Sequence, residues 1–316
     1  MDFDGIDDQV ITGLTKIDSS LTVEVWVKLN TLTPSDPLGL IITKWIGASA
    51  EDFAIVYNSA TQKIYGQLRN VTLGTNSVIN TINTVSANEW YHIALTYDKA
   101  TLKFYLNGIV QDSIVGTNQV ELDHTNSINV GGSGNNDFFL DGEIDEVKIW
   151  NTALSQNEIR GWMTKKLNRT HPKISDIEAY YRFDENTGTI LQDLAGGNDG
   201  TLTNMDAATD WVLSGAALGD KSVNTYGGSS LSTTLSNGNG ISLSDFSSAD
   251  GMHIYTVEDT PQGSSYPTNT TNQDSTEYFG VFMVGGDSYD VTFDYSSSSF
   301  KGTSSEAQIR AIKRDN

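Results

Sequence analysis

Two carboxylates in the segment Gly142–Trp150 have a spacing that suits sugar hydrolysis. Side chains of a β-strand alternate between two faces, so we expect Glu143, Asp145 and Val147 to share one face and Glu146 to lie on the other. A retaining glycoside hydrolase needs two carboxyl groups about 5 Å apart on such a face. Because position 147 is aliphatic, the segment predicts a strand without a complete catalytic pair.

A second acidic group opens the chain in the segment Phe3–Val10, which contains Asp4, Asp7 and Asp8. Calcium takes six to eight oxygen ligands from carboxylates, carbonyls and water. Carboxylates that lie together without a cation repel one another, so a shared ion gives the cluster a physical reason. The alternative is that these acids are turn residues satisfied by water or by backbone N–H groups.

Composition excludes several other chemistries. The chain has no cysteine, so it can form neither a disulfide nor a thiolate metal site. With 19 basic and 40 acidic residues its net charge is −21, which argues against nucleic acid, since that affinity rests on Lys and Arg neutralising phosphates. No apolar run approaches the roughly 20 residues of a membrane helix. The four histidines share no spacing typical of a metal site.

Short alternating runs predict antiparallel strands. Leu21–Lys28 places four aliphatic residues on one face, and Asn107-Gly108 is typical of a two-residue hairpin turn. Each such strand has one apolar face, and two stacked sheets would bury these faces between them, so the sequence predicts a β-sandwich. Only one helix is predicted, over residues 155–167, because Ser155 and Glu158 form a capping box before an apolar stripe.

Beyond about Asp220 the chain becomes rich in Ser, Thr, Gly and Asn and shows no helical pattern. We expect a smaller β-sandwich of six or seven strands there. The strands suggested by alternation are Gly251–Glu258, Glu277–Val284, Tyr289–Tyr295 and Ala307–Lys313, and Pro261–Ser275 is predicted to be a long loop.

Five short segments occur in order along the first two thirds of the chain: Phe3–Asp8, Val23–Val27, Trp90–Ala94, Tyr105–Gly108 and Gly142–Leu154. Together they resemble a laminin-G-like (concanavalin A-like lectin) domain of large secreted bacterial proteins. The continuation Ala179–Glu185 is similar to the segment directly after such domains in surface adhesins of Bacteroidota. The resemblance implies an all-β chain, with a concanavalin A-like jelly-roll sandwich over residues 1–220 and a small, Ser/Thr/Gly-rich β-sandwich over 221–316.

The resemblance also implies a cofactor. In this fold a calcium ion commonly ties the first strand region to the last strand, and the matching ligands are Asp4, Asp7, Asp8 and Asp145. Glucanases of the same fold carry Glu-x-Asp-x-Glu on one strand. Here Val147 replaces the second glutamate, so the resemblance does not imply an enzyme.

Sugar binding needs exposed aromatic side chains with amide or carboxylate groups nearby. Trp45 precedes a polar loop, and a Gly-rich loop at 131–137 has the flexible backbone of a ligand-contacting segment. Ordinary surface is the alternative at each position. The candidate carbohydrate-binding residues are Trp45, Asp52, Tyr65, Arg69, Asn135, Asn136 and Asp137.

These features predict a non-catalytic, calcium-supported carbohydrate-binding module for adhesion to glycans or surface polysaccharide. The alternatives are a structural spacer or protein–protein contact within an adhesin, and a glycoside hydrolase with an unrecognised site. No signal sequence precedes Phe3. We therefore expect this chain to be a piece of a larger protein, and the resemblance implies that this protein is secreted and lies at the cell surface.

Overall fold

The computed structural model describes residues 1–17, 20–45, 51–70, 75–116, 122, 125–135, 137–246, 248–259 and 277–294. The chain forms two compact units, one of residues 1–159 and 168–216 and the other of residues 160–167 and 217–316. The sequence suggested a boundary at 220. In the structure the chain passes to the second unit after Ala216, and residues 160–167 also group with that unit.

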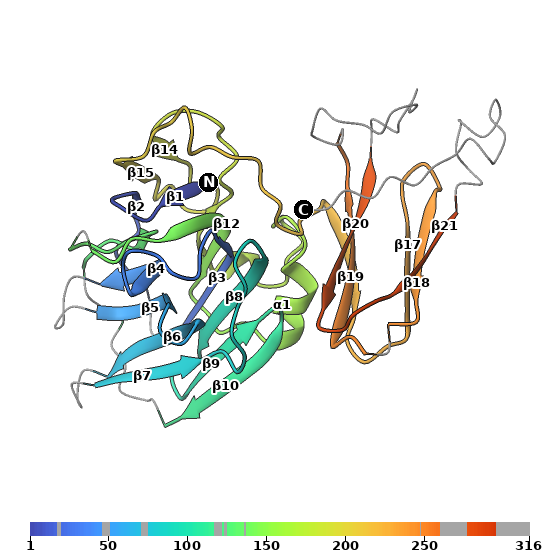
Figure 1. Ribbon diagram of the computed structural model, residues 1–316, viewed down its shortest axis with the longest axis horizontal. Helices are drawn as coiled ribbons and strands as arrows, with labels where there is room; N and C mark the ends of the chain where they lie inside the picture. The colour runs from blue at the N-terminus through green and yellow to red at the C-terminus, as the bar shows by residue number, and fades with distance from the viewer. Residues whose placement is uncertain are drawn as a thin grey trace. The chain divides into compact units, whose positions relative to one another are not determined.

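The first unit has a seven-stranded antiparallel sheet, called sheet A here, in the order β1-β12-β3-β8-β9-β10, with β13 also paired to β12 (Figure 1). Its strands are β1 (Asp2–Asp4), β3 (Leu21–Leu29), β8 (Trp90–Tyr97), β9 (Thr101–Leu106), β10 (Ile109–Val115), β12 (Asp141–Trp150) and β13 (Ile177–Tyr181).

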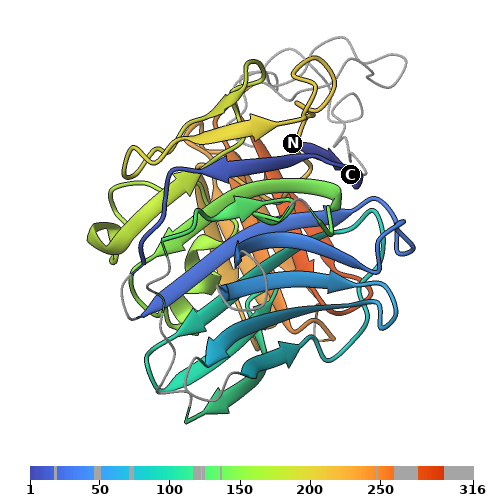
Figure 2. The same ribbon diagram turned by 90° about the vertical axis from the view of Figure 1, so that its left-hand side faces the viewer.

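The second layer of the unit is an eight-stranded sheet, sheet B, in the order β14-β15-β2-β11-β4-β5-β6-β7. Figure 2 shows these strands stacked in this order across the front of the unit. They are β2 (Gln9–Thr12), β4 (Leu38–Trp45), β5 (Glu51–Asn58), β6 (Lys63–Asn70), β7 (Thr75–Asn80), β11 (Asn129–Val130), β14 (Ile190–Leu191) and β15 (Gly200–Thr203).

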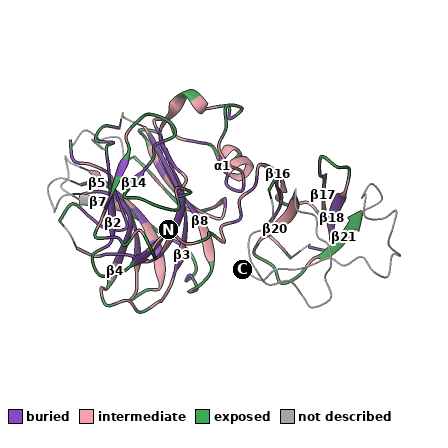
Figure 3. Cartoon of the chain, turned by 90° about the horizontal axis from the view of Figure 1, so that it is seen from above, coloured by how far each residue is buried: buried purple, intermediate pink, exposed green. Residues whose placement is uncertain are grey.

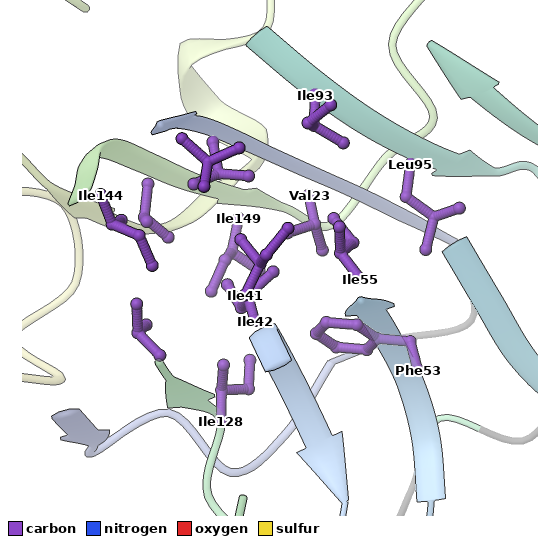
Figure 4. Close-up of a cluster of buried hydrophobic side chains, with 14 of the residues drawn as sticks. Val23, Ile41, Ile42, Phe53, Ile55, Ile93, Leu95, Ile128, Ile144 and Ile149 are labelled. Carbon is purple, nitrogen blue, oxygen red and sulfur yellow. The ribbon is translucent and has the colours of Figure 1, made fainter. Parts of the chain in front are cut away.

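The core of the first unit lies between the two sheets. On β3 it takes up Leu21, Val23, Val25 and Val27, as the alternation predicted. Figure 4 shows Val23 among apolar side chains of both sheets, such as Ile149 of sheet A and Ile55 of sheet B. Gly66 on β6 lets the sheets approach closely, because a Cβ atom there would lie 2.6 Å from the Leu95 side chain. Buried residues accordingly follow the strands in Figure 3.

The second unit is a small sandwich of two three-stranded sheets, in the orders β16-β19-β20 and β17-β18-β21. Its core includes Ile241 and Leu243 from one sheet and Met252 and Ile254 from the other. The strands are β16 (Lys221–Thr225), β17 (Ser230–Thr234), β18 (Gly240–Ser244), β19 (Gly251–Val257), β20 (Tyr278–Val284) and β21 (Asp290–Asp294). The predicted strand Ala307–Lys313 and loop Pro261–Ser275 lie outside the described residues.

The predicted capping box is present at the start of helix α1 (Gln156–Trp162). Ser155 Oγ accepts a hydrogen bond from Glu158 N at 3.3 Å, and Glu158 accepts one from Ser155 N at 2.7 Å. The helix ends earlier than the apolar stripe suggested. Residues 164–166 instead exchange backbone hydrogen bonds with Gly219, which is incompatible with further helical turns.

The predicted hairpin turn is also present, with Asn107 and Gly108 at φ angles of 50° and 73°. A short 3-10 helix, η1 (Ile174–Asp176), precedes β13. Within the described residues, no helix is both long enough and apolar enough to cross a membrane.

Candidate functional site

Three aromatic side chains lie on the outer face of sheet B, the face turned away from the core. Trp45 ends β4, Tyr65 lies on β6, and Phe138 follows the Gly-rich loop. All three are half-buried and pack on a small apolar cluster of Leu40, Ala54 and Val56. Trp45 and Phe138 are stacked, with ring centroids 6.2 Å apart and an interplanar angle of 5°. We call Trp45, Tyr65 and Phe138 the aromatic platform.

The loop that carries Phe138 is tied to β4 by hydrogen bonds at several points. Leu40 N donates to Phe138 O at 2.9 Å, and Gly134 N donates to Trp45 O at 3.3 Å. Thr43 Oγ1 donates to Gly132 O at 3.0 Å. These bonds hold Phe138 in place beside Trp45. The platform is therefore a fixed surface in its described part.

The other predicted sugar-binding residues fall into different environments. Asn135 is exposed on the loop, and Asp137 is half-buried and accepts a hydrogen bond from Ser133 Oγ. Arg69 is half-buried on β6 and faces outward like Tyr65, from which it is separated by an even number of positions. Asn136 lies outside the described residues.

Asp52 does not belong to the candidate site. Its side chain and that of Lys44 are both 0% exposed and form an ion pair. A carboxylate held in this way cannot reach a ligand at the surface. The sequence suggested otherwise because Asp52 directly follows a polar loop, and the burial of a charged pair leaves no signal in the residue pattern.

The predicted calcium ligands at the start of the chain come together. One carboxylate oxygen from each of Asp4, Asp7 and Asp8 lies within 4.8 Å of the others. Gly5 adopts φ +72° and turns the chain back, so that Asp8 Oδ2 accepts a hydrogen bond from Asp4 N at 3.1 Å. Asp141, on β12 opposite Asp4, is a neighbouring acid that was not among the predicted ligands.

The electrostatics of this acidic cluster favour a cation. Burial, followed by the charges of Asp4, Asp210 and Asp7, raises the pKa of Asp8 to about 6. Burial and the charges of Asp2 and Asp4 also raise the pKa of Asp141. A divalent ion would relieve this repulsion, and carboxylate oxygens are the ligands that calcium prefers. The donor set therefore fits calcium.

Asp145 is not a member of that cluster. It lies on β12 opposite Trp26 of β3, four positions along the strand from Asp141, which is the residue that pairs with Asp4. Its side chain is buried, and burial followed by the charge of Glu146 raises its pKa to about 7. The expectation of one ion bound by all four aspartates is therefore not met by the geometry of the described residues.

A β-bulge changes the faces of β12. Its register against β3 shifts between Asp145 and Lys148, and Glu146 has φ +51°. Val147 is in the core between the sheets. Glu146 accepts a hydrogen bond from Tyr180 Oη at 2.8 Å and lies 3.0 Å from Lys148 Nζ. The prediction that Val147 shares a face with Asp145, and that Glu146 faces away from it, was wrong.

The carboxylates on this outer side of sheet A are engaged in internal contacts. Glu143 forms an ion pair with Lys28. Asp145 and Glu146 are 4% and 2% exposed. Glu24 on the neighbouring strand accepts a hydrogen bond from Trp150 Nε1 at 2.8 Å and is also buried. This arrangement satisfies buried acids with buried donors, as a structural network does.

Phe138 is the site residue that sequence reasoning missed. It directly follows Asp137 in the Gly-rich loop, and an aromatic residue at the end of a polar loop was the available signal. The predicted residues of that segment were the polar ones, because they can hydrogen-bond to sugar hydroxyls, whereas Phe138 can contribute only an apolar ring face.

Residues 4–160 match the family model for the concanavalin A-like lectin/glucanases superfamily. With the two-layered fold described above, the match shows that the chain belongs to this superfamily through its first unit. No curated protein matches the chain.

Several solved structures are similar to part of this chain. A carbohydrate-binding candidate from Bacteroides ovatus is 18% identical, with a TM-score of 0.50 over 65% of this chain and 58% of its own. A heptameric SAP-like pentraxin from Limulus polyphemus is 14% identical, with a TM-score of 0.46 over 65% of this chain and 94% of its own. The CBM40 of Ruminococcus gnavus IT-sialidase, bound to α2,3-sialyllactose, is 14% identical, with a TM-score of 0.41 over 51% of this chain and 95% of its own.

This chain spans only 58% of the Bacteroides ovatus protein. At such low identity the likeness shows the fold alone.

Proposed function

We propose that this chain is a non-catalytic carbohydrate-binding module, supported by calcium, of a secreted cell-surface protein that adheres to glycans. The observation that carries the proposal is the aromatic platform on the outer face of sheet B. Apolar ring faces suit the C–H faces of sugars, and a platform held by backbone hydrogen bonds loses little entropy on binding. Amide and guanidinium groups of Gln67 and Arg69 on the same face offer hydrogen bonds to hydroxyl groups.

Calcium has a structural place in this proposal. Asp4, Asp7 and Asp8 would hold the ion at the start of the chain. This position lies beside Asp141, the first residue of β12. Phe3, between these acids and the core, touches Gly131 at the base of the loop that carries Phe138. An ion there would stabilise the loop base and, through it, the platform.

The absence of catalysis is supported by the contacts of the acids on β12. Glu143 is paired with Lys28, whereas Asp145 and Glu146 are buried. A hydrolase of this fold would need two carboxylates open to a substrate.

A glycan array tests the proposal, read with calcium and with a chelator. We expect binding to glycans in calcium that is lost from the Trp45→Ala variant and weakened by chelation. Trp90→Ala is the matched control, because Trp90 is also half-buried but lies on sheet A. Arrays that stay blank in calcium, with a folded protein, would instead support a spacer within an adhesin.

Calcium itself is tested by titration calorimetry with Asp7→Asn and Asp8→Asn. We expect both variants to lose calcium binding. Asp287→Asn removes the same charge from an exposed position in the second unit and should bind as the wild type does. Unchanged binding by the two cluster variants would remove calcium from the proposal.

A further inference from the structure

The outer face of sheet B continues past the aromatic platform toward the edge of the sheet. On β6, Tyr65 lies opposite Asn80 of β7, and Gln67 lies opposite Val78. Alternation places all four on the outer face, because Ile64, Leu68 and Ile79 between them are in the core. Gln67, Val78 and Asn80 therefore extend the platform toward the edge of the sheet, and we call these three residues the second row.

Two residues of the second row are exposed to solvent, and Gln67 is half-buried. Val78 is 42% exposed although it is aliphatic, and Asn80 is exposed. Strand β7 ends the hydrogen-bonded order of sheet B, and its neighbour beyond that edge is β10 of sheet A. The face from β4 to β7 spans three strand spacings, roughly 14 Å. A ligand that crosses this face needs to be longer than one sugar ring.

The chemistry of the second row selects the ligand further. Tyr65, Gln67, Val78 and Asn80 carry no charge. Their phenol and amide groups match sugar hydroxyls, and Val78 matches a ring C–H face. Lys63 and Arg69 flank Tyr65 and Gln67 on the same face of β6, so this face also offers cations to a sugar that carries an acidic group.

We propose that the ligand of sheet B is an extended chain of sugar units that crosses strands β4 to β7. Internal units of the chain contact the aromatic platform, and further units contact Gln67, Val78 and Asn80. This inference rests on the proposed carbohydrate-binding function and adds to it the mode of recognition.

Calorimetry with cello-, xylo- and laminari-oligosaccharides, from disaccharide to hexasaccharide, tests the inference. In the series that binds, we expect affinity to rise with chain length and then to level off. Val78→Ala and Asn80→Ala should weaken hexasaccharide binding about fivefold each, the factor for roughly 1 kcal/mol, and leave disaccharide binding unchanged. Val115→Ala is the control, because Val115 is 78% exposed but lies on β10 of sheet A.

The outcomes separate this inference from the proposed function. Equal affinity for all chain lengths would show recognition of a terminal sugar and overturn the inference, while the binding function would stand. Loss of all glycan binding, on the array and in calorimetry, would overturn the proposed function together with the inference.

Discussion

Gly131 packs against the ring of Phe3, and this contact joins the loop of the aromatic platform to the strand that carries Asp4 of the candidate cation cluster. Its φ is +81°, and a Cβ atom there would lie 2.3 Å from the ring of Phe3. Gly131→Ala would therefore add backbone strain and force the ring of Phe3 to move. Phe3 is flanked by β1 residues that pair with β12, so its movement would disturb both the acids and the loop.

The expected cost has two parts. A left-handed conformation costs an alanine roughly 1–2 kcal/mol. Overpacking against a buried ring costs roughly 1–3 kcal/mol more. Gly116→Ala is the matched control, because Gly116 has φ +85° and nothing within 4 Å of its added Cβ atom. The difference between the two variants isolates the contact with Phe3.

Urea unfolding followed by tryptophan fluorescence gives the comparison. All tryptophans except Trp162 belong to the first unit, so the signal reports mainly on that unit. We expect Gly131→Ala to lower the unfolding free energy by about 1–3 kcal/mol more than Gly116→Ala does. Equal destabilisation by the two substitutions would refute the reasoning, since strain alone would then account for both.

Three further predictions concern other parts of the chain. Ser155→Ala should lower stability by about 1 kcal/mol in urea unfolding, because it removes the N-cap of α1, whereas the control Ser113→Ala removes an exposed hydroxyl from β10 and should change stability little. Because the pKa of Asp145 is raised in the folded protein, its protonated form stabilises the fold at low pH, and this stability is lost as the pH rises from about 4 to about 7. In Asp145→Asn the urea midpoint should therefore depend less on pH over that range. The same pH dependence in the variant and the wild type would contradict the raised pKa. A fragment of residues 217–316 should not give a folded spectrum by circular dichroism, because it lacks Thr164, which contacts His253 Nδ1 at 3.1 Å, and Arg160, which lies 3.7 Å above the Tyr226 ring.

The fold could be predicted wherever residue types act locally. Alternation on β3 identified the core face, Asn-Gly identified the hairpin turn, and Ser155 with Glu158 identified the helix start. Each of these signals depends on neighbours in sequence. The capping box illustrates the limit as well, since the helix end was set by Gly219, which is distant in the chain.

The candidate site was harder to predict because it depends on departures from regular geometry. The bulge at Glu146 reverses the faces that strict alternation assigns, and no glycine marks it. The sequence predicted Asp52 at the end of a polar loop, yet its pairing with Lys44 places it in the interior. The grouping of Asp4, Asp7 and Asp8 was accessible because Gly5 turns the chain locally, whereas the distance of Asp145 from them depends on strand register.

The division of helix α1 between the two units bears on how such a chain arises. The chain enters the second unit after Ile159, leaves it after Leu167, and enters it again after Ala216. A continuous stretch of coding sequence that begins after Ala216 would not carry the whole second unit into a new gene. Exchange of this unit between proteins by recombination would have to include the adjoining part of the lectin-like fold, so the two are expected to be inherited together.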